Sequence, residues 1–276
     1  MNNYFQHCDR IVSDWMNPGF LNSQTCKNDP FLSIQKSNRG LLQQKYLDLM
    51  PELFWGDPDD NVAVMLNLNP GFGTKDVNHI GKKKVSNILK NGYSSFAKTS
   101  PYFTDPHFHP DATNWWEKRY AWLTSLFGNH AKYPFVLELC PWHSHNWSEA
   151  GISQFTQDQI SFIDRFVLDP AYKAVQNSIS GLVISVGKKY TEIYPQLGFH
   201  LEKEWGPEMS IPGWPLSNKT KKEKNVHFLY YSKTIQTDSG AKIIKVLSIW
   251  LWGSNKTPCS EFLPIEKDII QYVQTH

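Results

Sequence analysis

The chain has 276 residues, of which 40% are hydrophobic and 20% are charged, and its formal net charge is +2. These values are typical of a globular chain that forms one elaborated α/β domain. The near-neutral total charge excludes a protein whose overall field draws it to nucleic acid, so any basic surface must be local. No apolar run approaches the roughly 20 residues that a membrane helix needs, and we expect no membrane partner.

Cysteine usage and the N-terminal sequence predict a cytoplasmic protein. The four cysteines are Cys8, Cys26, Cys140 and Cys259, and none of them forms a CxxC pair. Zinc-ribbon and iron–sulfur spacings are therefore not present, and four scattered thiols are typical of a reducing compartment. The opening sequence MNNYFQHCDRIVSDW lacks the basic segment and apolar core of a secretory signal.

The first half of the chain mixes loops with a few regular elements. Residues 1–36 are polar and aromatic and are expected to form a peripheral N-terminal wrap. GLLQQKYLDLM, residues 40–50, has apolar residues at helical spacing. VAVMLNL, residues 62–68, predicts the first strand, and NWWEKRYAWLTSLFG, residues 114–128, predicts an amphipathic helix that ends at its glycine.

The second half alternates strands and helices. Further strands are expected at 135–139, 181–187 and 226–231, and further helices at 155–168, 188–197, 238–253 and roughly 261–274. Near-continuous apolar strands that alternate with helices indicate a parallel sheet covered on both faces. We therefore predict a single α/β domain over residues 1–276.

Polar residues follow the predicted strands, and ligands of open parallel sheets bind outside the carboxyl ends of the strands. The residues at these positions are Asn69, Pro70, Gly71 and Phe72 after the first strand, Glu138 and His143 at the second, Lys188 after the third, and Ser232 and Lys233 after the fourth. We expect them to meet at one edge of the sheet, around a pocket.

Two of these residues have a structural as well as a functional interpretation. Asn-Pro-Gly is a strong turn signal, in which Asn69 can simply bond to its own backbone. Glu138 lies inside the apolar sequence FVLELC, where an unpartnered carboxylate is costly to bury. Glu138 is therefore either part of a salt bridge at the strand end or a carboxylate of the pocket.

The histidine pairs and the lysines are candidates for metal and phosphate binding. HFH at 107–109 and HSH at 143–145 could place four imidazoles around a metal, but no Asp or Cys completes a recognisable ligand spacing, so we assign no metal. Neither GxGxxG nor a Walker motif occurs, and no cofactor is expected.

Lysines cluster in loops, at Lys82, Lys83 and Lys84, at 188–189 and at 219–222. They form either a local positive rim that holds phosphates or an ordinary lysine surface.

Together, these motifs resemble those of the uracil-DNA glycosylase superfamily over roughly residues 50–252. MLNLNPGFG, residues 65–73, is similar to the first motif, in which a strand ends in Asn-Pro-Gly or Asp-Pro. FVLELCPWHSHNW followed by FTQDQISFI resembles the second strand, its loop and the next helix, and GLVISVGKKY resembles the third strand. VHFLYYSKT, residues 226–234, lies where the family has a strand followed by a His-Pro-Ser loop.

The resemblance implies a three-layer α/β/α sandwich with a short, mainly parallel four-stranded central sheet. It also implies cleavage of a base–sugar bond in DNA without a cofactor. In that comparison Asn69 orients the attacking water, Pro70 and Gly71 form the turn around it, and Phe72 borders the base pocket. The loop that holds DNA would contain Ser232 and Lys233.

The sequence departs from the family pattern at two positions. Glu138 stands where the family often has an Asn that reads uracil, and the last motif lacks its His, which His143 or His145 would have to replace. A carboxylate repels O4 of uracil but accepts from the amine of cytosine, a contact worth ~1–3 kcal/mol of discrimination. We therefore expect a cytosine-type base, modified so that the host genome is spared.

The superfamily that the chain resembles includes bacterial defence glycosylases that excise glucosylated hydroxymethylcytosine from phage DNA, so the resemblance implies this base as a candidate and antiviral defence as the setting. The Trp- and Pro-rich segments 101–116, 142–147 and 204–216 are expected to wall the sugar. Two alternatives stay open from the sequence. One is a module of the same fold that binds DNA or a modified base without turnover, and the other is a metal-dependent hydrolase built on the two HxH pairs.

Overall fold

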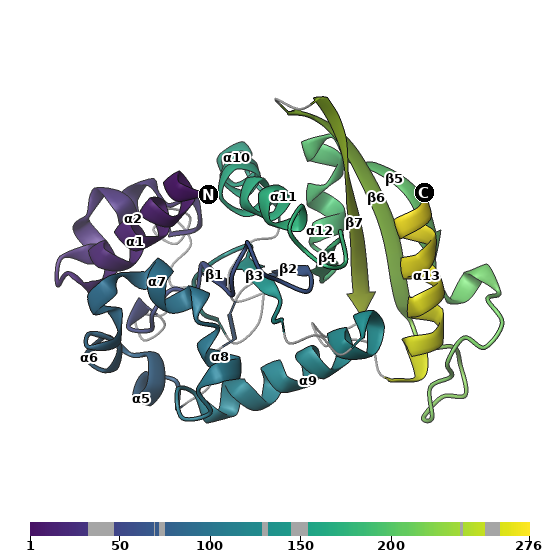
Figure 1. Ribbon diagram of the computed structural model, residues 1–276, viewed down its shortest axis with the longest axis horizontal. Helices are drawn as coiled ribbons and strands as arrows, with labels where there is room; N and C mark the ends of the chain where they lie inside the picture. Colours follow the sequence, from purple (N-terminus) through teal and green to yellow (C-terminus); the bar gives the residue numbers. More distant parts are fainter. Residues whose placement is uncertain are drawn as a thin grey trace.

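The computed structural model describes residues 1–32, 47–68, 70–71, 75–128, 132–144, 154–237, 240–251 and 260–276 (Figure 1). Asn69 and Phe72 lie outside the described residues, as does most of the helix expected at 40–50. Of the helices that the structure describes, each is too short or too polar to span a bilayer.

Among the described residues, the centre of the protein is a seven-stranded sheet with the order β1-β3-β2-β4-β7-β6-β5. The strands are β1 (Phe54–Trp55), β2 (Val64–Asn67), β3 (Phe135–Glu138), β4 (Val183–Val186), β5 (His200–Trp205), β6 (Val226–Thr237) and β7 (Gly240–Leu251). The neighbours β3, β2, β4 and β7 run parallel, whereas β1, β6 and β5 pair antiparallel. The α/β class is as predicted, but the sheet has seven strands rather than four.

The three strands expected at 62–68, 135–139 and 181–187 are confirmed as β2, β3 and β4. All their residues are buried. Such near-continuous apolar segments are what a central parallel sheet requires, because helices cover both of its faces.

The expected helix at 238–253 is wrong, because this segment contains strand β7. β7 pairs with β4 on one side and with β6 on the other, so it is a central strand. A buried strand has an uninterrupted apolar run, and such a run is also compatible with the apolar spacing of a helix. The β-branched residues of KIIKVLSIWL favour the strand. The fourth parallel strand is therefore β7, and the segment expected to fill that place, 226–231, belongs to the antiparallel β6.

Helices lie on both sides of the sheet (Figure 1). They are α1 (Asn2–Met16), α2 (Gln24–Asn28), α5 (Val77–Ile80), α6 (Lys82–Val85), α7 (Tyr93–Lys98), α8 (Pro101–Thr104), α9 (Pro110–Phe127), α10 (Gln157–Ile163), α11 (Asp169–Val175), α12 (Tyr190–Ile193) and α13 (Leu263–Thr275). Figure 1 shows α10, α11 and α12 on one side and α9 and α13 on the other. The helices expected at 114–128, 155–168, 188–197 and 261–274 are confirmed, with somewhat different ends.

The N-terminal segment is more ordered than its sequence suggests. Within the expected wrap of residues 1–36, α1 buries one face made of Tyr4, Phe5, Cys8, Ile11, Val12 and Trp15. These positions follow the helical repeat, so the aromatic residues of this segment belong to the core. Trp15 Nε1 also donates to the Leu47 carbonyl oxygen at 2.6 Å, which ties the helix to the rest of the fold.

Helix α9 carries a charged side chain across the face of the sheet. The ring of His109 caps its start by accepting from the Ala112 amide at 3.3 Å, and Pro110 occupies the first turn. Gly128 ends the helix with a positive φ of 90°. The buried face of α9 includes Arg119, whose guanidinium therefore points toward strand β2 of the sheet.

The Tyr93 hydroxyl binds the backbone of the edge strand β1. It accepts from the amides of Leu53 and Phe54 at 3.0 and 3.2 Å and donates to the Phe54 carbonyl oxygen at 2.8 Å. We expect Tyr93→Phe to lower the free energy of unfolding by about 1–3 kcal/mol, because these buried backbone groups lose their partner. Chemical denaturation measures the change.

Tyr133→Phe is the matched control, since Tyr133 is half-buried and its hydroxyl has no hydrogen bond among the residues that the structure describes. Equal losses of stability in the two variants would contradict the role given to Tyr93.

Candidate functional site

Two polar side chains meet where the central parallel strands end. Asn67 is the last residue of β2, Glu138 is the last residue of β3, and the two are register partners. Paired residues on neighbouring strands point to the same face of a sheet. Asn67 Nδ2 donates to Glu138 Oε1 at 2.9 Å, and both residues are at most 5% exposed. An amide and an acid therefore share one buried position at the carboxyl edge.

Arg119 of α9 completes this group, which we call the Asn67–Glu138–Arg119 cluster. The Arg119 side chain is buried, and its Nη1 lies 3.5 Å from Oδ1 of Asn67. The guanidinium also lies over the Trp115 ring, 3.9 Å from the centroid. Asn67 thus donates to the acid and faces the cation, and the amide connects the two ionisable groups.

Burial dominates the electrostatics of the cluster. It raises the pKa of Glu138 to about 8, against the opposing effects of the Asn67 hydrogen bond and the Arg119 charge. Burial lowers the pKa of Arg119 to about 9, against the effect of Glu138. At neutral pH the guanidinium is therefore charged and Glu138 is largely protonated. Glu138 Oε2 is buried and has no hydrogen-bond partner among the described residues.

The end of β2 is also held by a hydrogen bond from helix α12 to its backbone. The hydroxyl of Tyr190, the first residue of α12, donates to the backbone carbonyl oxygen of Asn67. Tyr190 is fully buried. This bond limits how far the strand end can move, so the position of the Asn67 amide is set by the fold.

His143 contacts the backbone of the segment Pro70–Gly71, which follows Asn69. Its Nδ1 lies 2.7 Å from the Gly71 carbonyl oxygen and its Nε2 lies 2.9 Å from that of Met50. The amide of Ser144 also donates to the Pro70 carbonyl oxygen, at 3.3 Å. Since both ring nitrogens face backbone oxygens, His143 is placed to position the turn rather than to donate to a substrate.

Glu52 lies beside His143 and is another buried acid. Its Oε1 accepts from the Tyr102 hydroxyl at 2.6 Å, and its Oε2 accepts from Trp55 Nε1 at 2.8 Å. Its Oε1 is also 3.7 Å from His143 Nε2. Each carboxylate oxygen already has a donor, so Glu52 helps to fix the position of the side chains around His143.

The predicted DNA-binding residues do not all reach this edge. Ser232 and Lys233 pair with Lys245 and Ile244 on β7, whereas β4 starts opposite the next residue, Val246. They therefore lie beyond the amino end of β4, at the opposite end of the sheet from Asn67 and Glu138. The expectation of a loop at 232–233 on the carboxyl edge is wrong, because β6 continues through these residues to Thr237.

The other predicted lysines lie at the surface, and two of them, Lys82 and Lys188, have aromatic neighbours. Lys83 and Lys84 on α6 are exposed, and Lys82 is half-buried with its Nζ 5.1 Å from the Trp15 ring centroid. Lys188, after β4, is exposed and has its Nζ 4.5 Å from the Trp250 ring centroid. Their role in DNA binding stays a prediction.

The tryptophans of the segments expected to wall a sugar are mostly core residues. Residues 101–116 form α8 and the start of α9, in which Trp116 is buried. Trp142 is buried and donates to Asp29 Oδ2 at 3.0 Å, and Trp214 is buried and donates to the Lys224 carbonyl oxygen at 2.8 Å. Within the described part of these segments, Trp115 is the most exposed tryptophan, at 41%, and the Arg119 guanidinium lies over its ring.

The two HxH pairs do not form a metal site in the described structure. His109 Nε2 lies 3.1 Å from Asp76 Oδ1 while its other nitrogen caps α9, His107 is exposed, and His145 lies outside the described residues. The group of described His and acidic residues that is close enough to hold a metal is a different one, made of Glu204, Glu208 and His227.

Sequence patterns did not single out Asn67, Arg119 or Glu52. Asn67 interrupts the apolar run VAVMLNL, and a polar residue within a buried strand was the signal that could have found it. Arg119 lies on the apolar stripe of α9, where a cation needs a partner in the same way. No protein-family model, curated protein or solved structure matches the chain. The function is therefore inferred from these side chains and from the resemblance of the motifs.

The buried acid predicts a pH-dependent stability. Glu138 holds its proton more tightly in the folded state, so its stabilising contribution is complete below its ordinary pKa of 4.5 and is lost as the pH rises through about 8. Between about pH 5 and about pH 9 we expect the free energy of unfolding to fall by on the order of 1–4 kcal/mol. Glu138→Gln should reduce this fall, as measured by denaturant titration at each pH.

Burial also raises the pKa of Asp29 to about 6 and that of Glu266 to about 7, so a residual slope remains in the variant. Glu266→Gln removes a buried acid that is far from the cluster in sequence, and it is the control for this residual pH dependence of the stability. Identical slopes for the wild type and Glu138→Gln would show that Glu138 is ionised over the whole range.

Proposed function

We propose that the chain is a monofunctional DNA glycosylase, which hydrolyses the bond between a flipped-out pyrimidine base, preferably of the cytosine type, and its sugar. The observation that carries the proposal is the buried Asn67–Glu138–Arg119 cluster, which lies at the carboxyl ends of the parallel strands, where Asn67 is two residues before the sequence Asn69-Pro70-Gly71. An acid, an amide and a cation at this edge suit recognition of a polar ring whose negative charge increases during bond cleavage.

The architecture supports the proposal in outline. Four neighbouring strands run parallel, with helices on both sides (Figure 1), which is compatible with the three-layer α/β/α sandwich that the resemblance implies. The fourth of these strands is β7, so a DNA-binding loop after the fourth strand would be sought at 252–259, WGSNKTPC, rather than at 232–233. Residues 252–259 lie outside the described part of the chain.

In the proposed reaction the target nucleotide rotates out of the stack, at a cost of a few kcal/mol. Exposed Lys83, Lys84 and Lys188 are the candidates for holding DNA phosphates. Glu138 Oε1 is fixed by Asn67, which leaves Oε2 to contact the base. The Arg119 guanidinium stabilises the negative charge that develops on the departing base, the task for which the family's last motif uses a His.

Asn69 is proposed to orient the water that attacks the sugar carbon. An amide cannot remove a proton effectively, so its contribution would be positioning. The turn after Asn69 is held by His143 at the Gly71 carbonyl oxygen and by Ser144 at that of Pro70. His143 therefore supports the site as a positioning residue in this proposal, without touching the base.

The protonation of Glu138 changes the expected discrimination between cytosine and uracil, which assumed an ionised carboxylate. With a pKa near 8, Glu138 at neutral pH is largely a carboxylic acid, which donates as well as accepts. The acid form can bond to the carbonyl oxygen of uracil as well as to cytosine, whereas the ionised form favours the amine of cytosine. Selectivity for a cytosine-type base should therefore depend on pH.

Base release by Asn69→Ala tests the catalytic proposal. We expect the variant to bind DNA as the wild type does but to lose base release by at least about 100-fold, because the water is no longer oriented. The substrates are duplex and single-stranded DNAs with uracil, cytosine, hydroxymethylcytosine or its glucosylated form, and alkaline cleavage reveals sites without a base. Binding by the wild type without alkali-labile sites on any substrate would identify a binding module instead.

The pH dependence of selectivity tests the role of Glu138. Between about pH 6 and about pH 9 we expect the ratio of kcat/KM for the cytosine-type base over uracil to rise roughly tenfold, as ionisation removes the donor and creates a repulsive contact with uracil. Glu138→Gln, which cannot ionise, should give a ratio that is independent of pH. A parallel rise in the variant would assign the effect to another group.

A further inference from the structure

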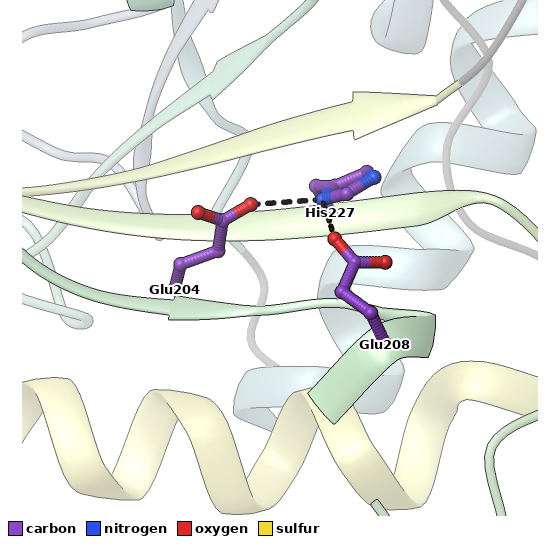
Figure 2. Close-up of side chains that lie close together, drawn as sticks. All are labelled: Glu204, Glu208 and His227. Carbon is purple, nitrogen blue, oxygen red and sulfur yellow. Dashed lines mark hydrogen bonds and ion pairs between the residues drawn. The ribbon is translucent and has the colours of Figure 1, made fainter. Parts of the chain in front are cut away.

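Outside the Asn67–Glu138–Arg119 cluster, three side chains converge at the outer part of the sheet. Figure 2 shows Glu204 of β5 and Glu208 of the short helix η6 (Pro207–Met209) directed toward His227 of β6. Glu204 Oε1 lies 2.9 Å and Glu208 Oε1 lies 3.7 Å from the same ring nitrogen, Nδ1. We propose that Glu204, Glu208 and His227 form a binding site for a divalent transition-metal ion of the zinc class.

The spacing of the ligand atoms suits such an ion. Zinc binds imidazole nitrogen and carboxylate oxygen at roughly 2.0–2.2 Å, so a tetrahedral ion keeps its ligand atoms about 3.4 Å apart. The two distances from Nδ1, 2.9 and 3.7 Å, lie on either side of this value, and the three ligand atoms all lie within 4.8 Å of one another. Small side-chain rotations would admit the ion without a change of backbone.

The imidazole is oriented as a metal-binding histidine usually is. Nε2 of His227 faces Oδ1 of Asn225 at 2.8 Å, so Nε2 donates its proton to this oxygen and Nδ1 is directed at the two carboxylates. The ring is also stacked on Trp250, with centroids 4.5 Å apart and an interplanar angle of 21°. A hydrogen bond and a stacking contact thus fix the ring before a metal arrives.

The glycine at position 206 leaves room for this arrangement of side chains. A Cβ at Gly206 would lie 2.9 Å from Nδ1 of His227 and 3.3 Å from Oε1 of Glu208, which places it among the ligand atoms themselves. Two carboxylates beside one imidazole carry net negative charge, which a divalent cation neutralises. The Glu208 side chain is 62% exposed, so an ion can enter from solvent.

The site is separate from the proposed base pocket. The strand pairings Leu66–Ser185, Ser185–Ser248 and Ser248–Leu229 place Leu66, Leu229 and therefore His227 on one face of the sheet. Asn67, the neighbour of Leu66, faces the opposite side. A metal here would join β5, η6 and β6, so its expected effect is on stability rather than on the chemistry of base release.

Metal titration of the full-length protein tests the proposal. After treatment with a chelator and dialysis, the protein is titrated with Zn²⁺ by calorimetry and with Co²⁺ by visible absorption, which reports tetrahedral coordination. We expect one ion to bind per chain, Zn²⁺ to displace Co²⁺, and the Tm to rise by about 5 °C or more at saturating Zn²⁺. His227→Gln and Glu204→Gln should each weaken binding at least about tenfold.

His200→Gln is the matched control, since His200 is an exposed imidazole on the same strand as Glu204 and should leave binding unchanged. If His227→Gln does not fold, Glu208→Gln replaces it, because this exposed carboxylate contributes little to the fold and its loss should still weaken Zn²⁺ binding. Absence of saturable binding by the wild type, or equal affinity in the Glu208→Gln and wild-type proteins, would overturn the proposal and leave a Glu–His ion pair.

Discussion

The hydrogen bond from Asn67 to Glu138 constrains the rest of the site. It joins β2 and β3 at the residue where both strands end, and both partners are buried, so each depends on the other to offset its loss of water. A slip of one residue between the strands would turn the two side chains to opposite faces of the sheet. The polar pair therefore specifies the register of the parallel sheet and places chemistry at its edge.

A buried cation makes this pair more than a structural contact. Arg119 reaches Asn67 because α9 crosses the sheet with a defined start, capped by His109, and a defined end at Gly128. Burial keeps Glu138 largely protonated at neutral pH while Arg119 stays charged. The cluster thus combines a hydrogen-bond donor and a positive charge at one point. Both are suited to the negative charge that a departing base acquires in the proposed reaction.

The two faces of the sheet have different roles in these proposals. The face with Asn67 and Glu138 carries the proposed base site, where α9 supplies the cation, whereas Glu204 and His227 lie on the other face in the antiparallel extension of the sheet. The abundant aromatic residues mostly fill the core between these layers, as Trp15, Trp55 and Trp142 do. The high aromatic content therefore reflects packing more than a stacking surface for ligands.

The sequence alone determined the α/β class, the first three parallel strands and four of the helices, because buried strands and amphipathic helices have local apolar patterns. It also placed Glu138 at a strand end. It could not distinguish β7 from a helix, since a strand buried on both faces loses the alternation that identifies strands, and this error moved Ser232 and Lys233 to the wrong edge.

Only the tertiary structure brought Asn67, Glu138 and Arg119 together. They come from two strands and a helix: Asn67 is 52 residues from Arg119 and 71 residues from Glu138 along the chain, and no local pattern encodes such contacts. The protonation of Glu138 is likewise a property of the fold, because it arises from the removal of water by side chains that are distant in sequence. Local periodicity specified the elements, whereas the packing between them determined the position and the charge of the functional groups.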